Sequence, residues 1–328
     1  MAFDLVKFTS QLYTAVTATV DQQVNLFNEA TRGAITLAPS NANVGDFSMV
    51  ASFQEIKNLV RRRDVNNGTN TIQQARLKQL SNVSVKVASG TPEIVFEPAQ
   101  YEWIKQDPET AAVVIAEQLA PATLQDQLNS ALAGLVSAMT GNAEVVNDVT
   151  KTTDKTASLS NIAATSAKFG DRSTSLVAWV VHSKTMHDIW GEAIKNGQQL
   201  FKYESINVTE DPFGRIFVMT DSPALYVPAK SEEPETPAYY YSLGLVPQAA
   251  LVQPNNDFYA TMVEKTGTEN IQRLYQAEWS YNLGLRGYTW DTANGGSSPS
   301  NVSIGTSSNW DKTAASNKDT AGVMMKSE

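Results

Sequence analysis

The chain has 328 residues, 42% of them hydrophobic, which suits one large lobed domain or two closely connected ones with a sizeable core. The excess of 34 acidic over 25 basic side chains gives a net charge of −9, which argues against a nucleic-acid footprint spread over the whole protein. There is no cysteine, so disulfides, thiolate metal sites and cysteine nucleophiles are excluded. No secretory signal and no run of 18 apolar residues is visible, so we expect a protein made in the cytoplasm that does not enter a membrane.

The first 45 residues predict a helix followed by an arm. Apolar side chains recur at three- and four-residue steps over residues 5–27, which is typical of an amphipathic helix that ends at Gly33. The small and polar residues 39–45 then indicate an extended arm with little core of its own.

Residues 47–90 predict a long two-stranded excursion. A helical piece is expected over residues 53–60, a turn at 66–68, and a half-exposed strand where Val83, Val85 and Val87 alternate with polar residues. Because an isolated hairpin is marginal in water, we expect this one to find its partner on another subunit.

The strongest predicted helix covers residues 122–140. Asp107-Pro108-Glu109 is a helix start with a capping carboxylate and a proline at the first helical position. Pro121 is expected to interrupt or kink this helix before the apolar repeat that ends at Gly141.

An α/β unit is predicted after a polar junction at residues 142–175, which contains a weak helical piece near 159–169. The apolar run 176–181 reads as a buried strand, Ser183 as the cap of a helix over 184–194, and residues 215–220 as the next strand.

Further strands are predicted at 239–241 and 243–252, and strict alternation over 275–282 predicts a long strand that continues through residues 283–290. Residues 294–328 are rich in Ser, Asn, Gly and Thr, and we interpret them as a tail that orders by docking, with Trp310 as its anchor.

No catalytic, cofactor-binding or metal-binding residue is assigned. The only histidines, His182 and His187, are five residues apart and do not share a helical face, so they predict no metal site. No nucleophile elbow, Walker sequence or dinucleotide fingerprint occurs, and Glu232-Glu233 lies in a proline-rich stretch that reads as a loop.

The densest positive patch is Arg61, Arg62 and Arg63, followed by Asp64. The patch is short and has no interleaved aromatic side chains for base stacking, so we interpret these four residues as an inter-subunit contact on an acidic neighbour.

The order of these elements resembles the tailed-bacteriophage major capsid proteins with the Hong Kong 97 type fold, an α+β fold. Several phrases are similar to that family, and only their order carries weight. They are residues 59–64, 181–186, 214–223, 267–270 and 287–290, with Pro299 and Asn309-Trp310 following.

The resemblance implies a division into an N-terminal arm, an extended loop (E-loop), a peripheral (P) domain with a long spine helix, and an axial (A) domain. The corresponding ranges are 1–45 for the arm, 46–90 for the loop, 91–157 for the peripheral domain with the spine helix, 158–260 for the axial domain, 261–293 for the long peripheral strands, and 294–328 for the tail. Gly45, Gly68 and Gly90 are hinge candidates, beside the simpler interpretation of each as an ordinary turn.

The implied function is a virion head-shell protein that self-assembles into hexamers and pentamers around double-stranded DNA, without sequence-specific binding or enzymatic activity. Separate scaffolding and portal proteins are the implied partners, and a decoration protein is left open. The alternatives are another self-assembling structural protein, such as a tail or bacterial compartment shell subunit, and a soluble enzyme without a visible motif.

Overall fold

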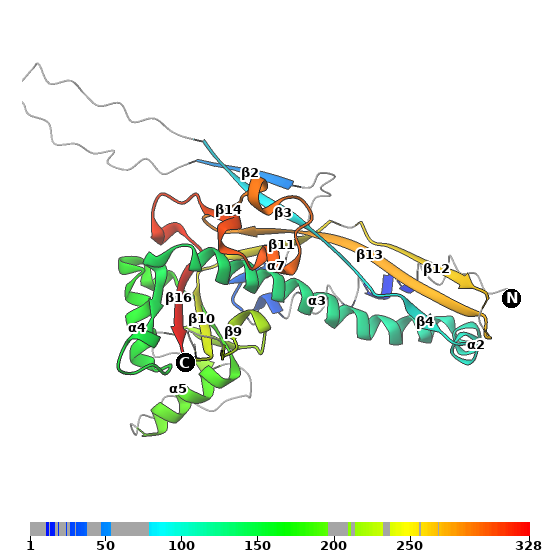
Figure 1. The fold of residues 1–328 in the computed structure, drawn as a ribbon, viewed down its shortest axis with the longest axis horizontal. Helices are drawn as coiled ribbons and strands as arrows, with labels where there is room; N and C mark the ends of the chain where they lie inside the picture. Colours follow the sequence, from blue (N-terminus) through cyan, green and yellow to red (C-terminus); the bar gives the residue numbers. More distant parts are fainter. Residues whose placement is uncertain are drawn as a thin grey trace, which may run out of the picture.

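A computed structural model places two seven-stranded sheets and one long helix at the centre of the protein (Figure 1). It describes residues 11, 12, 14–16, 19, 24, 27–29, 31–37, 47–53, 79–195, 209–210, 214–231, 237–255, 257–267 and 269–328. The residues 54–78 between two strands lie outside this description.

The helices are α2 (Pro98–Gln106), α3 (Pro108–Thr140), α4 (Leu159–Ala167), α5 (Ser183–Lys195), α6 (Thr292–Gly295) and α7 (Asn301–Ile304). Short 3₁₀ turns are η1 (Ala143–Val145), η2 (Val149–Lys151), η3 (Gly170–Ser175), η4 (Pro223–Leu225), η5 (Ser307–Asn309) and η6 (Asn317–Asp319). The strands are β1 (Ile35–Leu37), β2 (Phe47–Phe53), β3 (Gln79–Gly90), β4 (Ile94–Phe96), β5 (Val146–Asp148), β6 (Ala178–Val181), β7 (Thr209–Glu210), β8 (Ile216–Met219), β9 (Tyr226–Val227), β10 (Tyr239–Leu245), β11 (Ala250–Pro254), β12 (Tyr259–Lys265), β13 (Gln272–Leu285), β14 (Tyr288–Trp290), β15 (Trp310–Lys312) and β16 (Gly322–Ser327).

The first sheet is organised around strand β13, which confirms the long strand predicted from the alternation over 275–282. The predicted continuation of this sheet through residue 290 is wrong, because β13 ends at Leu285 and β14 pairs with β15 in a separate two-stranded sheet. β13 pairs with β12 and β11 in sequence along one edge, and with β4 and β3 along the other. Strand β2 then pairs with the outer edge of β3, so the two strands of the predicted hairpin are present. Fourteen residues extend about 46 Å at strand spacing, so β13 runs the length of the peripheral part.

Helix α3 lies along one face of this sheet and spans about 50 Å over its 33 residues (Figure 1). Asp107 caps it as predicted, because its side chain accepts a hydrogen bond from the Thr110 amide at 3.2 Å. Polar contacts tie the helix to the sheet. The hydroxyl of Tyr281 on β13 donates to Ser130 at 2.9 Å, and Ser89 on β3 donates to Asp126 at 2.9 Å.

The predicted break at Pro121 is wrong, because α3 is continuous from Pro108 to Thr140. Its first half packs against α2, β12 and β13, and this packing offsets the backbone hydrogen bond that the proline removes.

The second sheet has the order β5-β16-β10-β6-β8-β7, with β9 also paired to β10. Strands β6 and β8 are parallel and joined through α5, which confirms the predicted strand, helix, strand order. The predicted cap of α5 is corrected. The Lys184 amide donates to His182 Nδ1 at 3.2 Å and the Ser183 amide donates to Asp221 at 3.3 Å, so the residue before Ser183 supplies the cap.

The C-terminal segment is not a tail. Strand β16 lies inside the second sheet, antiparallel to β10 and parallel to β5, and Val323, Met324 and Met325 are buried. Trp310 is buried too, and its ring meets that of Trp290 edge-on with centroids 4.9 Å apart. Within this polar segment lies a short apolar strand whose partners, β10 and β5, are about 80 and about 180 residues earlier in the sequence.

Two hydrophobic cores result. The larger joins both sheets through α3, and the smaller lies at the distal end among α2, the first half of α3, β12 and β13. Leu12 and Val16 from the predicted N-terminal helix are buried in the smaller core, so this part packs on its own chain.

Replacing Pro121 by alanine is expected to stabilise the protein by about 1–2 kcal/mol, since Pro121 is exposed and alanine restores a helical hydrogen bond. Thermal unfolding measures the change. The control Ala122→Gly, at an exposed neighbouring position, is expected to destabilise the helix by about 1 kcal/mol. A lower midpoint for Pro121→Ala would mean that the packing requires the proline.

Replacing Met325 by alanine is expected to cost about 2–5 kcal/mol of unfolding free energy, because Met325 is fully buried in the second sheet. The control is Val302→Ala, whose side chain is 80% exposed and should change stability by less than about 0.5 kcal/mol. Denaturant unfolding compares the two variants, and equal stabilities would support a docked tail instead.

Candidate assembly surfaces

Most of the residues proposed from the sequence as contact or hinge positions lie outside the described residues. These are Arg61, Arg62, Arg63, Asp64, Gly45 and Gly68. Gly90 is described, and it is the last residue of β3, paired with Glu278. A Cβ atom on Gly90 would lie 2.9 Å from the Ala277 carbonyl oxygen, so glycine here allows β3 to approach β13 closely.

The base of the hairpin is fixed where β3 leaves β13. The Val83 amide donates to the Thr289 hydroxyl at 2.8 Å, and the Thr313 hydroxyl donates to the Asn82 side chain at 2.9 Å. Beyond the residues of β3 that pair with β13, side chains from β14 and from the residue after β15 therefore hold β3 in place.

The distal half of the first sheet exposes an apolar row on the face opposite the smaller core. Val263 on β12, Leu274 on β13 and Val95 on β4 lie directly opposite one another across three strands and so share a face. Val263 is 55% exposed and Val95 40% exposed, and no described element covers them. Uncovered apolar rows of this kind mark contact surfaces.

Beside this row lies an open groove of about 570 Å³ whose lining includes Lys86, Asp257, Tyr259, Glu278 and Ser280. Lys86 Nζ lies 3.3 Å from the Asp257 carboxylate. Burial acts to raise the pKa of Asp257, but hydrogen bonds from Ser280 and the charge of Lys86 outweigh it and hold the pKa below its usual value. Glu278 makes no ion pair with a described residue, so the groove carries an excess of negative charge.

Beneath the groove lies a buried polar network. The Asn255 side chain donates to Ser280 at 2.9 Å, and the Asn282 side chain donates to Asn255 at 2.6 Å. Ser280 also donates hydrogen bonds to the Asp257 carboxylate through its amide and its hydroxyl, so the network supports the acidic side of the groove.

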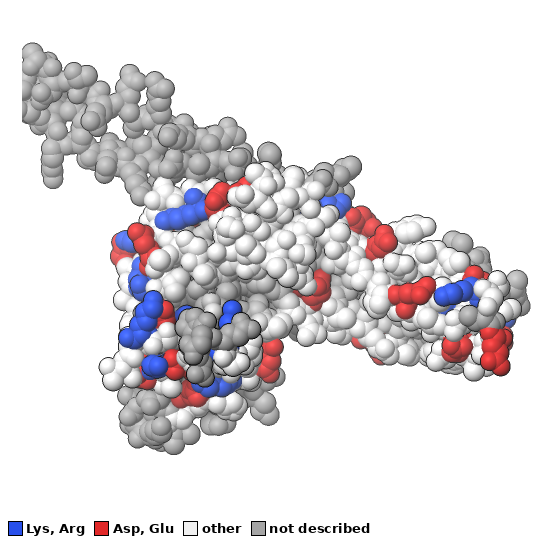
Figure 2. Space-filling model, in the orientation of Figure 1, with Lys and Arg blue, Asp and Glu red and all other residues white. Residues whose placement is uncertain are grey.

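The charged residues of the visible face lie at the second-sheet end, along the upper edge of the body and at the distal end (Figure 2). Blue and red often lie next to each other there, and ion pairs such as Lys155–Glu328, Asp171–Lys318 and Glu102–Lys105 join opposite charges. No group of three metal-binding side chains occurs among the described residues. His182 faces Asp221 at 3.6 Å, and His187 meets the Trp190 ring edge-on.

Sequence reasoning missed the apolar row. The only local signal was the alternation of Tyr259, Thr261 and Val263 with the residues between them, which is typical of a strand. Without the pairing of β12 with β13, this alternation does not show which face of the strand is exposed. In the part of the chain that is described, no helix is both long and apolar enough to cross a membrane.

The fold is similar to that of solved phage capsid proteins. It is similar to the cyanophage Pam1 capsid asymmetric unit, with a TM-score of 0.55 and 11% identity over 89% of this chain and 87% of that one. It is also similar to the head structure of Helicobacter pylori bacteriophage KHP40, with a TM-score of 0.50 and 9% identity over 91% and 88% of the two chains. At these identities the likeness establishes the Hong Kong 97 type α+β fold expected from the sequence.

The family follows from the sequence. The model of the Gp13-like family, described as major capsid protein 13-like, matches residues 4–324, so the chain belongs to this family of major capsid proteins. No curated protein sequence matches it. The family match therefore shows a major capsid protein that builds the phage head shell, and this confirms that part of the expected function.

Charges placed on the apolar row are expected to block assembly without unfolding the subunit. Val95→Asp with Val263→Asp exposes no new core, so thermal stability should change by less than about 1 kcal/mol, while particle yield falls by at least about tenfold. Sedimentation measures the yield, with Val302→Asp at another exposed position as the control. A normal particle yield from the double variant would show that the apolar row makes no assembly contact.

Proposed function

We propose that this chain forms hexamers and pentamers of an icosahedral shell around double-stranded DNA, in which the hairpin residues 54–78 of one copy lie on the distal face of the first sheet of a neighbour. The family match over residues 4–324 is the observation that carries the role in the shell. The division into arm, extended loop, peripheral domain and axial domain is part of the proposal, with revised bounds. Residues 322–327 and 146–148 pair within the second sheet and go with the axial part, whereas residues 250–254 pair within the first sheet and go with the peripheral part.

Charge supports this choice of neighbouring surface. Residues 54–78 carry six basic side chains, Arg61, Arg62 and Arg63 among them, against two acidic ones, although the whole chain has a net charge of −9. The groove with Asp257 and Glu278 offers the opposite charge. Such complementarity steers association and fixes register more than it adds affinity.

Apolar character supports it as well. Leu59 and Val60 precede the three arginines in the sequence, and the exposed row of Val95, Leu274 and Val263 lies beside the groove. Residues 54–78 thus have a short apolar stretch beside a basic one, and the proposed surface has an apolar row beside an acidic groove, so the two are complementary in both apolar character and charge. The hairpin strands β2 and β3 run from residues 47–53 and 79–90, so both ends of the segment start from the base held by Thr289 and Thr313.

We further propose separate scaffolding and portal proteins, packaged DNA held by proximity alone, assembly in the host cytoplasm, and no enzymatic activity. A decoration protein fits this account without being required by it. The acidic net charge favours solubility at high concentration before assembly.

Negative-stain microscopy and sedimentation of the full chain, alone and with its scaffold candidate, test the shell role. Hollow isometric particles or rings of five and six subunits are expected. A compact monomer under both conditions would contradict the proposal, and closed shells formed by the chain alone would contradict the need for a scaffold.

Reversing Arg61, Arg62 and Arg63 to glutamate is expected to lower particle yield by at least about tenfold, because three favourable charge contacts become repulsive. Introducing Glu278→Arg in the same chain should recover part of that yield. The matched control reverses three exposed lysines near the second sheet, Lys151, Lys168 and Lys230, and should assemble. Failure of Glu278→Arg to rescue would place the arginines on another surface.

A further inference from the structure

Residues 313–321, which we call the bridging segment, run from strand β15 beside the hairpin base to strand β16 in the second sheet. At its start, the amides of Thr313 and Ala314 both donate to the Gly287 carbonyl, at 3.0 and 3.1 Å. The Thr313 hydroxyl donates to Asn82 on β3 at 2.9 Å. The segment therefore begins in direct contact with the strand that carries the hairpin.

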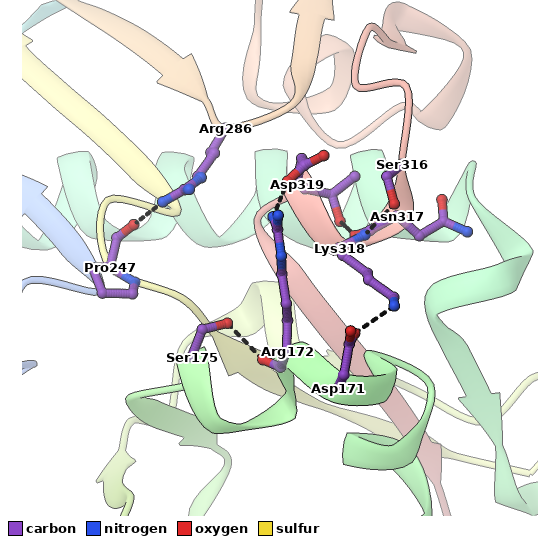
Figure 3. Close-up of polar contacts among 10 residues, drawn as sticks. Asp171, Arg172, Ser175, Pro247, Arg286, Ser316, Asn317, Lys318 and Asp319 are labelled. Carbon is purple, nitrogen blue, oxygen red and sulfur yellow. Dashed lines mark hydrogen bonds and ion pairs between the residues drawn. The ribbon is translucent and has the colours of Figure 1, made fainter. Parts of the chain in front are cut away.

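The other end of the bridging segment is clamped to the second sheet's side of the protein. Lys318 forms an ion pair with Asp171, and Asp319 forms one with Arg172, both on turn η3 (Figure 3). On η3 an acidic residue precedes a basic one, and on the bridging segment a basic residue precedes an acidic one, so each charge faces its opposite. Hydrogen bonding and charge attraction from Lys318 hold the pKa of Asp171 below its usual value. The Ala321 carbonyl then accepts from the Val246 amide at 3.1 Å, where β16 enters the sheet.

The middle of the segment packs closely against the turn between β13 and β14. It wraps around Gly287, which has a φ of +77°, and a Cβ atom there would lie 2.9 Å from Thr320 Cα and 3.0 Å from the Asp319 carbonyl oxygen. Two residues beyond Gly287, the Thr289 hydroxyl accepts from the Val83 amide of β3. The β13–β14 turn is therefore packed between the bridging segment and the hairpin base.

We propose that the bridging segment couples the position of the hairpin base to turn η3, so that the ion pairs Asp171–Lys318 and Arg172–Asp319 set how firmly β3 is held. The contacts with β3 and with η3 lie at the two ends of one short segment, and that segment is tightly packed around Gly287. Coupling between two places in a protein requires an unbroken series of contacts of this kind. The ion pairs are partly exposed, with 49% and 31% of the Arg172 and Asp319 side chains accessible, and exposed pairs of this kind are individually weak. They can open and close without unfolding either sheet.

The coupling goes beyond the proposed function and does not depend on it, because every contact lies within one chain. If neighbouring copies contact the hairpin, the bridging segment transmits the effect of that contact to the second sheet. Coupling free energies are reciprocal, so a change at either end must be felt at the other.

Hydrogen exchange of the full-length protein, with every variant in the same assembly state, tests the proposal. Asp171→Asn with Arg172→Gln removes both ion pairs without changing the net charge. It is expected to speed exchange about two- to fivefold at residues 79–85 as well as at 170–175 and 313–320. The matched control, Glu102→Gln with Lys105→Gln, removes an exposed pair on α2 at equal net charge and should leave residues 79–85 unchanged.

Two further variants make the result decisive. Exchanging the charges at all four positions, with Asp171→Lys, Arg172→Asp, Lys318→Asp and Asp319→Arg, restores both pairs in reverse and should return exchange at 79–85 to normal. Thr313→Val removes the hydroxyl that donates to Asn82 and should speed exchange at 170–175 from the opposite end. Changes confined to the mutated end in both cases would overturn the proposal, and particles that form normally at the same time would leave the shell function intact.

Discussion

Strand β13 carries hydrogen bonds along both edges, and every other part of the peripheral sheet takes its place from that ladder. β12 and β11 follow one another on one side, and β4 and β3 on the other. Helix α3 packs across the same strand and is tied to it through Tyr281, Ser130 and Asp126. Strand β3 also pairs with β2, so the position of both hairpin strands depends on the register between Val85 and Leu283.

Under the proposed function, one chain supplies both halves of the contact. One face of the distal sheet is closed by α2, α3 and the buried Leu12 and Val16, and the other face presents the apolar row and the acidic groove. That open face is the surface that the proposal assigns to a neighbour's residues 54–78. Assembly would then depend on a surface and a segment of every subunit.

Local signals predicted the elements that depend on local chemistry. The Asp107 cap, the alternation around Tyr275 to Tyr281 and the strand, helix, strand order near residues 176–220 are all visible in the sequence because neighbouring residues cause them. Long-range contacts decided the rest. Helix α3 continues through the exposed Pro121 because its opposite face packs on distant strands, and β16 is a strand because β10 and β5 provide its partners. The apolar row is defined by strand pairing, and the sequence alone could not tell which face of β12 would remain uncovered.

The most direct test is a cryo-electron microscopy reconstruction of assembled particles at a resolution that shows side chains. We expect residues 54–78 of one subunit to lie over Val95, Leu274 and Val263 of its neighbour, with the arginines at 61–63 near Glu278. A shell in which that face of the first sheet is open to solvent, and the hairpin lies on a different surface, would contradict it.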